Sequence, residues 1–206
     1  MVSPMSAALP KPHSPACERN RDPILGVLRP LLSGCQTVLE IGSGTGQHAV
    51  HFAAHLPHLR WQCSDRAVHL PGIQAWLDEA ALANTPTPLP LDVDDDTGWP
   101  EATADAVFTA NTLHYMPAAS SQRLLARAAQ ALTPGGLFVA YGPFNIDGRY
   151  TSESNADFDV WLRQIDLRFG IRDMAALDEA AAQQGLTRVG QHVMPAHNFC
   201  LVWQKG

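Results

Sequence analysis

A strand-like segment that ends in three glycines constrains the fold of this chain more than any other part of its sequence. The segment VLEIGSGTG, residues 38–46, is an apolar run that leads into Gly42, Gly44 and Gly46, and apolar residues at helical spacing follow it. Glycine allows a positive φ and lets the backbone approach a ligand closely. A strand, a glycine-rich turn and a helix in this order are typical of nucleotide-binding α/β folds. The glycines alone leave a dinucleotide, a nucleoside triphosphate or no ligand open.

Apolar strands alternate with helical stretches along most of the chain, and this alternation predicts a parallel sheet with helices on both faces. The expected helices lie near residues 46–56, 68–83, 117–132, 153–169 and 173–184, and Gly135 and Gly136 are expected to end the third of them. The expected strands of the parallel part cover residues 37–41, 60–64, 88–91, 106–110 and 137–141.

The last two apolar segments, TRVGQHVM and NFCLVWQ, are joined by only three residues, Pro195 to His197. Such a link is too short for a parallel crossover, so these strands are expected to form an antiparallel hairpin. The predicted fold is therefore α/β, with a mostly parallel sheet that a C-terminal antiparallel hairpin closes.

The N-terminal stretch, residues 1–15, holds four prolines and little that could pack, so we expect a flexible tail there. Asp22 and Pro23 are typical of a helix start, as N-cap and first helical residue, and Pro30 is expected to kink or end that helix. Residues 16–206 are expected to form a single domain.

Acidic residues fall at the predicted carboxyl ends of three successive strands. Asp65 and Asp92 each follow a strand, and Glu40 lies two residues before the first glycine. In an open α/β sheet the ligand binds at this edge. Asp65 suits the two hydroxyls of a ribose, Asp92 an adenine amine, and Glu40 a cationic group. A ribose, an adenine and a cation without a pyrophosphate indicate S-adenosylmethionine better than a dinucleotide.

The segment VLEIGSGTG resembles the first motif of class I methyltransferases that depend on S-adenosylmethionine, and the sheet with its terminal hairpin is similar to their Rossmann-like, seven-stranded fold. That resemblance covers residues from about 37 to 203. The segments SPACERNRDPIL, NTLHYMP, GPFNIDGRYTSESNADFDVWLR and FGIRDM further resemble a methyltransferase-like family of unknown function that includes methyltransferase-like protein twenty-six. This second resemblance spans residues from about 14 to 205.

The resemblance implies a cofactor, S-adenosylmethionine, a product, S-adenosylhomocysteine, and a set of residues that hold them. The glycines would line the methionine and ribose parts, Asp65 would bind the ribose, and Asn111 would lie beside the transferring methyl group. Arg19 and Asn20 match a motif that folds over the cofactor, and Arg19 could pair with the cofactor carboxylate. The cofactor-binding residues are thus Arg19, Asn20, Glu40, Gly42, Gly44, Gly46, Asp65, Asp92, Val93 and Asn111.

Two residues near strand ends are candidates for contact with the methyl acceptor. His114 lies just past the fourth strand and Tyr141 at the end of the fifth, so we hypothesise that they orient or deprotonate the acceptor. Asn145, in the polar and aromatic loop YGPFNIDGRY, is a candidate substrate-binding residue. The acceptor is expected to be a small molecule, with a protein side chain as the runner-up.

Several other classes of protein fit the sequence poorly. A short-chain reductase needs a Tyr-x-x-x-Lys pair and a P-loop hydrolase needs Gly-Lys-Ser/Thr, but the only lysines are Lys11 and Lys205. A net charge of −6 argues against nucleic acid as a partner. His48, His51 and His55 share helical spacing, but no acid or cysteine completes a metal site, so none is expected.

The cellular setting and the catalytic status are less constrained. Four scattered cysteines, without a C-x-x-C pair, favour a reduced, cytoplasmic protein, and no apolar run is long enough to suggest a membrane span. A non-catalytic module that binds S-adenosylmethionine stays open as an alternative, as does, with less support, a nicotinamide-dependent reductase. The sequence leaves the oligomeric state open.

Overall fold

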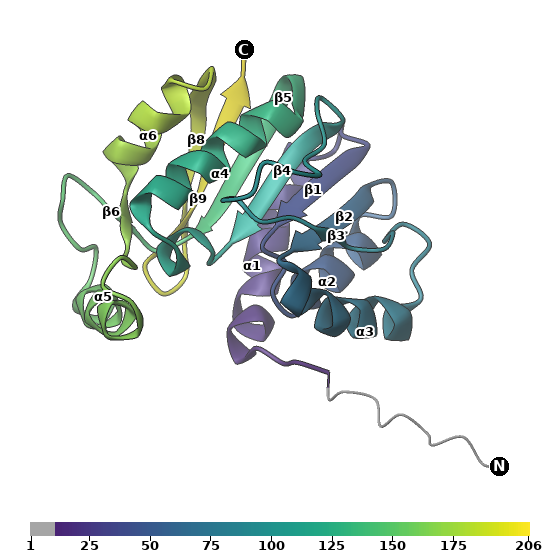
Figure 1. Cartoon of the computed structure of the whole chain (residues 1–206), viewed down its shortest axis with the longest axis horizontal. Helices are drawn as coiled ribbons and strands as arrows, with labels where there is room; N and C mark the ends of the chain where they lie inside the picture. The colour runs from purple at the N-terminus through teal and green to yellow at the C-terminus, as the bar shows by residue number, and fades with distance from the viewer. Residues whose placement is uncertain (1–10) are drawn as a thin grey trace.

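The structure, a computed structural model, describes residues 11–206 and contains a seven-stranded sheet with the order β3-β2-β1-β4-β5-β9-β8 (Figure 1). The first five of these strands pair in parallel, whereas β9 lies antiparallel between β5 and β8. This is the predicted α/β fold with its antiparallel hairpin. The strands are β1 (Thr37–Ile41), β2 (Arg60–Asp65), β3 (Leu89–Pro90), β4 (Ala104–Ala110), β5 (Leu132–Gly142), β8 (Leu186–Met194) and β9 (Asn198–Lys205).

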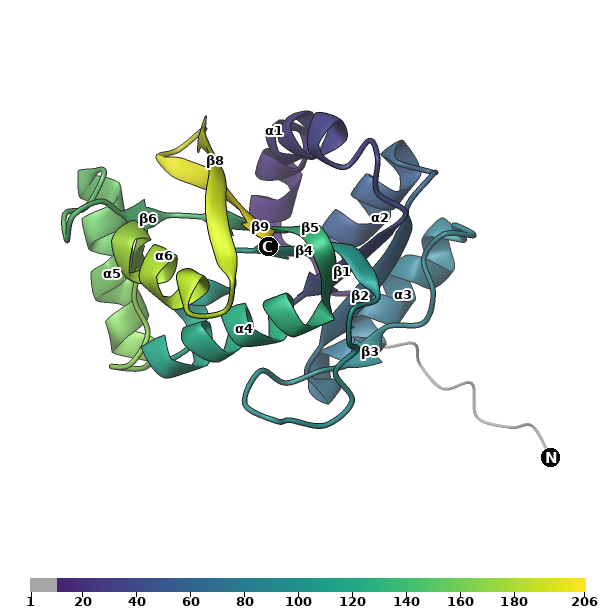
Figure 2. The ribbon, with the colours of Figure 1, turned by 90° about the horizontal axis from the view of Figure 1, so that it is seen from above.

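Helices cover both faces of this sheet (Figure 2). One face carries α1 (Pro15–Leu31), α2 (Gln47–His55) and α3 (Leu70–Ala80). The other carries α4 (Ala118–Ala131) and α6 (Met174–Ala182). The remaining elements are α5 (Glu153–Ile165), the short helices η1 (Ala67–His69) and η2 (Leu113–Tyr115), and a two-stranded sheet of β6 (Phe144–Asn145) and β7 (Arg172–Asp173).

Strand β1 shows how the two layers share one strand. Leu39 and Ile41 belong to the hydrophobic core that also contains residues of α4 and α6, whereas Val38 belongs to the core that contains residues of α1, α2 and α3. Successive side chains of a strand point to opposite faces. Glu40 therefore points to the same face as Val38, into the layer of α1, α2 and α3.

The N-terminal region differs from the prediction. Residues 1–10 of the expected tail lie outside the described residues, and its described part is packed on α3. Lys11 pairs with Glu79 at 2.6 Å, and the carbonyl of Pro12 accepts a hydrogen bond from the indole of Trp76 at 2.7 Å. Helix α1 begins at Pro15 rather than near Asp22.

The prolines inside α1 explain why the sequence pattern predicts the start of this helix too late in the chain. Pro23 and Pro30 both lie inside the helix, which continues through them. The buried residues Asn20, Ile24 and Leu28 recur every four positions, and this stripe holds the helix against the sheet. Tertiary packing thus overrides the local signal that a proline gives.

Strand β5 begins earlier than the predicted residue 137. The helix ends at Ala131, and β5 begins at once with Leu132, so Gly135 and Gly136 lie inside the strand. A Cβ on Gly136 would be 2.9 Å from the carbonyl oxygen of Thr133 and 3.0 Å from that of Asp105. Glycine is needed here for a close approach between backbones and not for ending a helix.

Candidate functional site

A cavity of ≈ 1070 Å³ lies at the edge of the sheet where the parallel strands end. Its walls come from the loops after β1, β2, β3 and β4, the first turns of α1, helix α5 and the turn between β8 and β9. Figure 1 shows α5 and the beginning of α1 at this same end of the molecule. Of the residues predicted from sequence, the cavity is lined by Arg19, Asn20, Gly42, Gly44, Asp65, Asp92, Val93, Asn111, His114 and Tyr141.

Three of the predicted site residues do not line this cavity: Glu40, Gly46 and Asn145. Asn145 belongs to β6, where it pairs with Asp173 of β7 in the small second sheet. Its side-chain oxygen is buried without a hydrogen-bond partner among the described residues. The structure thus separates Asn145 from the residues that surround the cavity.

The three glycines of the loop are needed for two different reasons. Gly42 has a φ of +71°, and a Cβ there would lie 2.8 Å from the Cγ2 of Thr112. Gly46, with a φ of +89°, precedes α2, and its Cβ would lie 3.1 Å from the Cα of Ile73 in α3. Gly44, with a φ of +59°, has open space where a Cβ would be, and it faces the cavity. The first and third glycines serve packing, and the second leaves room for a ligand.

Glu40 is buried in the layer of α1, α2 and α3, with 1% of its surface exposed. Its carboxylate accepts a hydrogen bond from the indole of Trp61 at 2.9 Å. Burial raises the pKa of Glu40 to about 7, although hydrogen bonds from Trp61 and Ser43 oppose the rise. Glu40 therefore lies behind the glycine loop and supports it, while its neighbour Ile41 reaches the cavity wall.

Asp65 and Asp92 occupy the edge of the cavity at the ends of β2 and β3. One carboxylate oxygen of Asp65 accepts a hydrogen bond from the amide of Gly44 at 2.8 Å, and the other accepts one from the amide of Arg66 at 2.7 Å. Asp92 accepts a hydrogen bond from the amide of Asp94 at 3.0 Å. Each carboxylate oxygen can accept more than one hydrogen bond, so both acids keep capacity for a ligand.

Asn111 follows β4 in an unusual conformation. Its φ is +54°, and its amide donates a hydrogen bond to the carbonyl of Tyr141 at 2.8 Å. A non-glycine residue at positive φ is uncommon, and such residues concentrate at ligand sites. The conformation places Asn111 in the cavity wall between β4 and β5.

The first turns of α1 are tied to the beginning of α2, directly after the glycine loop. The side-chain oxygen of Asn20 accepts a hydrogen bond from Nε2 of His48 at 2.6 Å. Gln47 donates to Glu18 at 2.8 Å and accepts from the amide of Ser14 at 2.6 Å. Burial lowers the pKa of His48 to about 4, so the imidazole is neutral. These contacts close one side of the cavity with α1.

His114 lies in η2 with 3% of its surface exposed, and its carbonyl accepts a hydrogen bond from the amide of Gly170 at 3.1 Å. Its Nε2 atom is buried and has no hydrogen-bond partner in the part of the chain that the structure describes. Burial, reinforced by the charge of Arg172, lowers the pKa of His114 to about 3. The cavity thus contains a neutral imidazole with one unsatisfied nitrogen.

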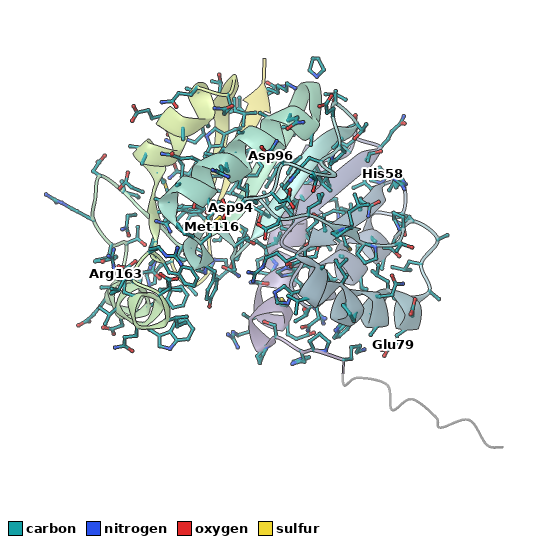
Figure 3. The ribbon with its side chains drawn as sticks, viewed as in Figure 1. His58, Glu79, Asp94, Asp96, Met116 and Arg163 are labelled. Atoms are coloured by element: carbon teal, nitrogen blue, oxygen red, sulfur yellow. The ribbon has the colours of Figure 1, made fainter. Side chains whose placement is uncertain are left out.

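An aromatic wall that the sequence pattern does not predict lies beside His114. Tyr115, Phe158 and Phe169 line the cavity, with ring centroids of His114 and Phe158 5.2 Å apart and those of Tyr115 and Phe169 6.3 Å apart. Met116, labelled in Figure 3, lines the same region. The segments NTLHYMP and GPFNIDGRYTSESNADFDVWLR contain most of these residues, but their spacing does not show that they meet.

Between residues 11 and 206, no helix combines the length and the apolar character that crossing a bilayer requires. Over the same residues, no cluster of three or more histidine, cysteine or acidic side chains is arranged to hold a metal ion.

The fold and the site define a class: an open α/β sheet of the class I methyltransferase type, with a ligand cavity beside a glycine loop. The chain belongs to the family described as "Protein of unknown function (DUF938)", which matches residues 11–205. Known proteins with the same fold include an O-methyltransferase family protein from Burkholderia thailandensis, with a TM-score of 0.81 and 19% identity. That match covers 93% of this chain and 57% of the other.

Two further relatives carry more specific descriptions. Human N-acetylserotonin methyltransferase, solved in complex with S-adenosylmethionine, matches with a TM-score of 0.76 and 17% identity over 93% of this chain and 53% of its own. The tetracenomycin polyketide synthesis 8-O-methyl transferase TcmO of Streptomyces glaucescens is 30% identical over 112 residues. Those residues are 54% of this chain and 32% of TcmO, so the chain spans only part of the length of these relatives.

Proposed function

We propose that this protein is an S-adenosylmethionine-dependent methyltransferase that acts on a small-molecule acceptor. The observation that carries the proposal is the cavity itself. It joins the open space at Gly44, the carboxylates of Asp65 and Asp92 and the strained Asn111 in one continuous wall. The fold shared with methyltransferases and the partial match to TcmO support it.

The lining residues fit the cofactor. A pocket of ≈ 1070 Å³ has room for a nucleoside together with an acceptor. We propose that Asp65 binds the ribose hydroxyls, that Asp92 and the backbone of Val93 hold the adenine, and that Gly42 and Gly44 lie along the ribose and methionine parts. Arg19, which precedes Asn20 in α1, would pair with the cofactor carboxylate.

When bound, S-adenosylmethionine supplies a methyl group on a positively charged sulfur, which is already a good leaving group. The contribution of the protein is then to align the acceptor with the methyl group and to exclude water. We propose that Asn111 and Tyr141 position the reacting groups, and that the neutral imidazole of His114 helps to orient the acceptor. The aromatic wall of Tyr115, Phe158 and Phe169 would face an acceptor of low polarity.

Glu40, Gly46 and Asn145 take different places in this proposal from those that the sequence suggested. Glu40 supports the glycine loop from behind through its hydrogen bond with Ser43, and Gly46 lets α2 pack on α3. Both act on the cofactor indirectly. Asn145 is not proposed as a substrate contact in the conformation described here.

Calorimetric titration with S-adenosylmethionine, S-adenosylhomocysteine and NADH tests the cofactor. We expect both sulfur compounds to bind and NADH to give no heat of binding. Binding of NADH alone would instead support the reductase. Methyl transfer is tested by incubation with labelled S-adenosylmethionine and a metabolite extract. Binding without transfer to any compound would support the non-catalytic module.

We further propose that the chain falls in the branch that includes methyltransferase-like protein twenty-six, because it contains segments such as SPACERNRDPIL and NTLHYMP. The chain from residue 16 onward is proposed to act as one domain. The four cysteines are free thiols in the structure, which favours a reducing, cytoplasmic setting.

A further inference from the structure

Two carboxylates near the aromatic wall are already engaged in other contacts. Asp166 lines the cavity, but Arg168 donates three hydrogen bonds to it, from its amide, its Nε and its Nη2, at 2.9, 3.0 and 2.7 Å. Asp159 is buried and accepts from Tyr150, from Arg163 (labelled in Figure 3) and from the amide of Ile171, at 2.8, 2.8 and 2.6 Å. Neither carboxylate is available as a base.

Asp94, a third acid of the cavity, and the two lysines are also engaged in other contacts. Asp94 accepts hydrogen bonds from Ser120 at 3.0 and 2.8 Å. Lys11 pairs with Glu79, and Lys205 donates to the carbonyls of Ala129 and Leu132 at 2.7 Å. The remaining acids that line the cavity, Asp65 and Asp92, belong to the part proposed for the nucleoside.

His114 is the one base candidate in the aromatic wall, and its surroundings oppose protonation. The guanidinium of Arg172 donates hydrogen bonds to the carbonyls of Leu113 and Met116, so a permanent positive charge sits on the turn that carries His114. Tyr115 and Phe158 pack against its ring, and its Nε2 has no hydrogen-bond partner, carboxylate or other, in residues 11–206. The low pKa of the imidazole agrees with this geometry.

Tyr141 cannot replace His114 as a base. Its side chain is 5% exposed, and burial raises the pKa of its hydroxyl further above the ordinary value. At neutral pH the hydroxyl keeps its proton. Tyr141 and His114 can therefore orient an acceptor through hydrogen bonds, but neither can take a proton from a hydroxyl group efficiently.

We propose that the acceptor atom attacks with a lone pair that is free before binding, as a thiolate sulfur or an unprotonated nitrogen, and that hydroxyl acceptors are poor substrates. This inference rests on the proposed methyltransferase function. The pKa of a thiol is about 1.5 units below that of a phenol, and thiols are intrinsically more nucleophilic. Sulfur also packs well against aromatic rings, and a wall of this kind would disfavour a protonated amine.

The atoms and electrons of this step balance without a base from the protein. A thiol loses its proton to solvent before the step. Its sulfur lone pair then forms the bond to the methyl carbon while the bond between that carbon and the sulfonium sulfur breaks. The electron pair of the broken bond stays on the departing sulfur, which becomes the thioether of S-adenosylhomocysteine. A neutral nitrogen reacts in the same way and releases its proton to solvent afterwards.

Thiophenol, aniline and phenol test the proposal, because they share one ring and differ in the attacking atom. Methylated product would be measured by mass spectrometry at pH 7. We expect thiophenol or aniline to be methylated and phenol to react at least about 100-fold more slowly, the factor that general-base assistance typically supplies. Comparable turnover of phenol would overturn the inference. So would the absence of turnover with all three in a protein that binds S-adenosylhomocysteine, whereas failure to bind it would overturn the proposed function.

A titration of His114 by NMR supplies a readout that does not depend on turnover. The His114 ring signal, assigned by comparison with His114→Gln, should show a neutral imidazole from pH 8 down to pH 5. Arg172→Gln should raise the pKa of this imidazole, while Arg172→Lys, which keeps the charge, should change it less. Protonation of wild-type His114 near its ordinary pKa would contradict the proposal.

Discussion

Asp65 is the single side chain whose removal should affect cofactor binding most directly. Asp65→Ala removes the carboxylate proposed to bind the ribose, and its amide contact with Gly44. Hydrogen bonds to charged groups contribute about 1.5–3 kcal/mol, so we expect the affinity for S-adenosylhomocysteine to fall about 10- to 100-fold. Calorimetric titration would measure this affinity. Asp78→Ala, an exposed acid on α3, is the matched control and should bind as the wild type does.

The buried Glu40 predicts a pH dependence of stability. Burial raises its pKa from 4.5 to about 7, so the folded protein holds this proton more tightly than the unfolded chain. The associated stability is complete below pH 4.5 and is lost as the pH rises through 7. Across this window, the free energy of unfolding should fall by on the order of 3 kcal/mol relative to Glu40→Gln. Urea unfolding at pH 4.5, 6 and 7.5 would measure the difference, and parallel curves for both proteins would contradict it.

At the residue scale, the sequence could predict the acids that follow strands but not the direction in which Glu40 points. Asp65 and Asp92 come after strand ends, and chain connectivity alone brings them to the ligand edge. Glu40 lies within β1, where alternation of side chains turns it toward Trp61. Which face a strand residue occupies depends on how helices cover the sheet, and Glu40 alone does not reveal this.

Helix α1 acts on the glycine loop through Gln47. This side chain is 4% exposed and forms hydrogen bonds with Ser14, Thr45 and Glu18. Gln47→Ala should lower the free energy of unfolding by about 1–3 kcal/mol, because buried partners lose their hydrogen bonds. Hydrogen exchange should become faster in residues 14–21. Gln74→Ala on α3, whose side chain donates a hydrogen bond to the exposed Asp78, is the control. Unchanged exchange in α1 would contradict the coupling.

At the element scale, the periodicity of apolar residues predicted the strands β1 to β5 and the hairpin, with errors only at their ends. It could not predict the aromatic wall. Phe158 of α5 meets Tyr115 of η2 because contacts such as the pairing of β6 with β7 bring distant segments together. Such contacts between distant short elements leave no periodic signal in the chain.

The molecule as a whole should be stabilised by S-adenosylhomocysteine, the product formed from the proposed cofactor. Free S-adenosylhomocysteine at 100 times its dissociation constant adds about 2.7 kcal/mol, which corresponds to a rise in Tm of about 5–10 °C for a chain of this size. Differential scanning fluorimetry would measure the rise. NADH at the same concentration should leave Tm unchanged, and an equal rise with NADH would contradict the cofactor assignment.

The position of β9 inside the sheet has a consequence for how the protein is made. Of the seven strands, β9 emerges last from the ribosome, yet it pairs with β5 on one side and β8 on the other. Until residues 198–205 are outside the exit tunnel, the long strand β5 has an open, apolar edge. Nascent chains with such an edge are prone to mispair with neighbouring chains. Synthesis of this protein therefore passes through an interval, before β9 has emerged, in which a chaperone that shields strand edges would improve the yield.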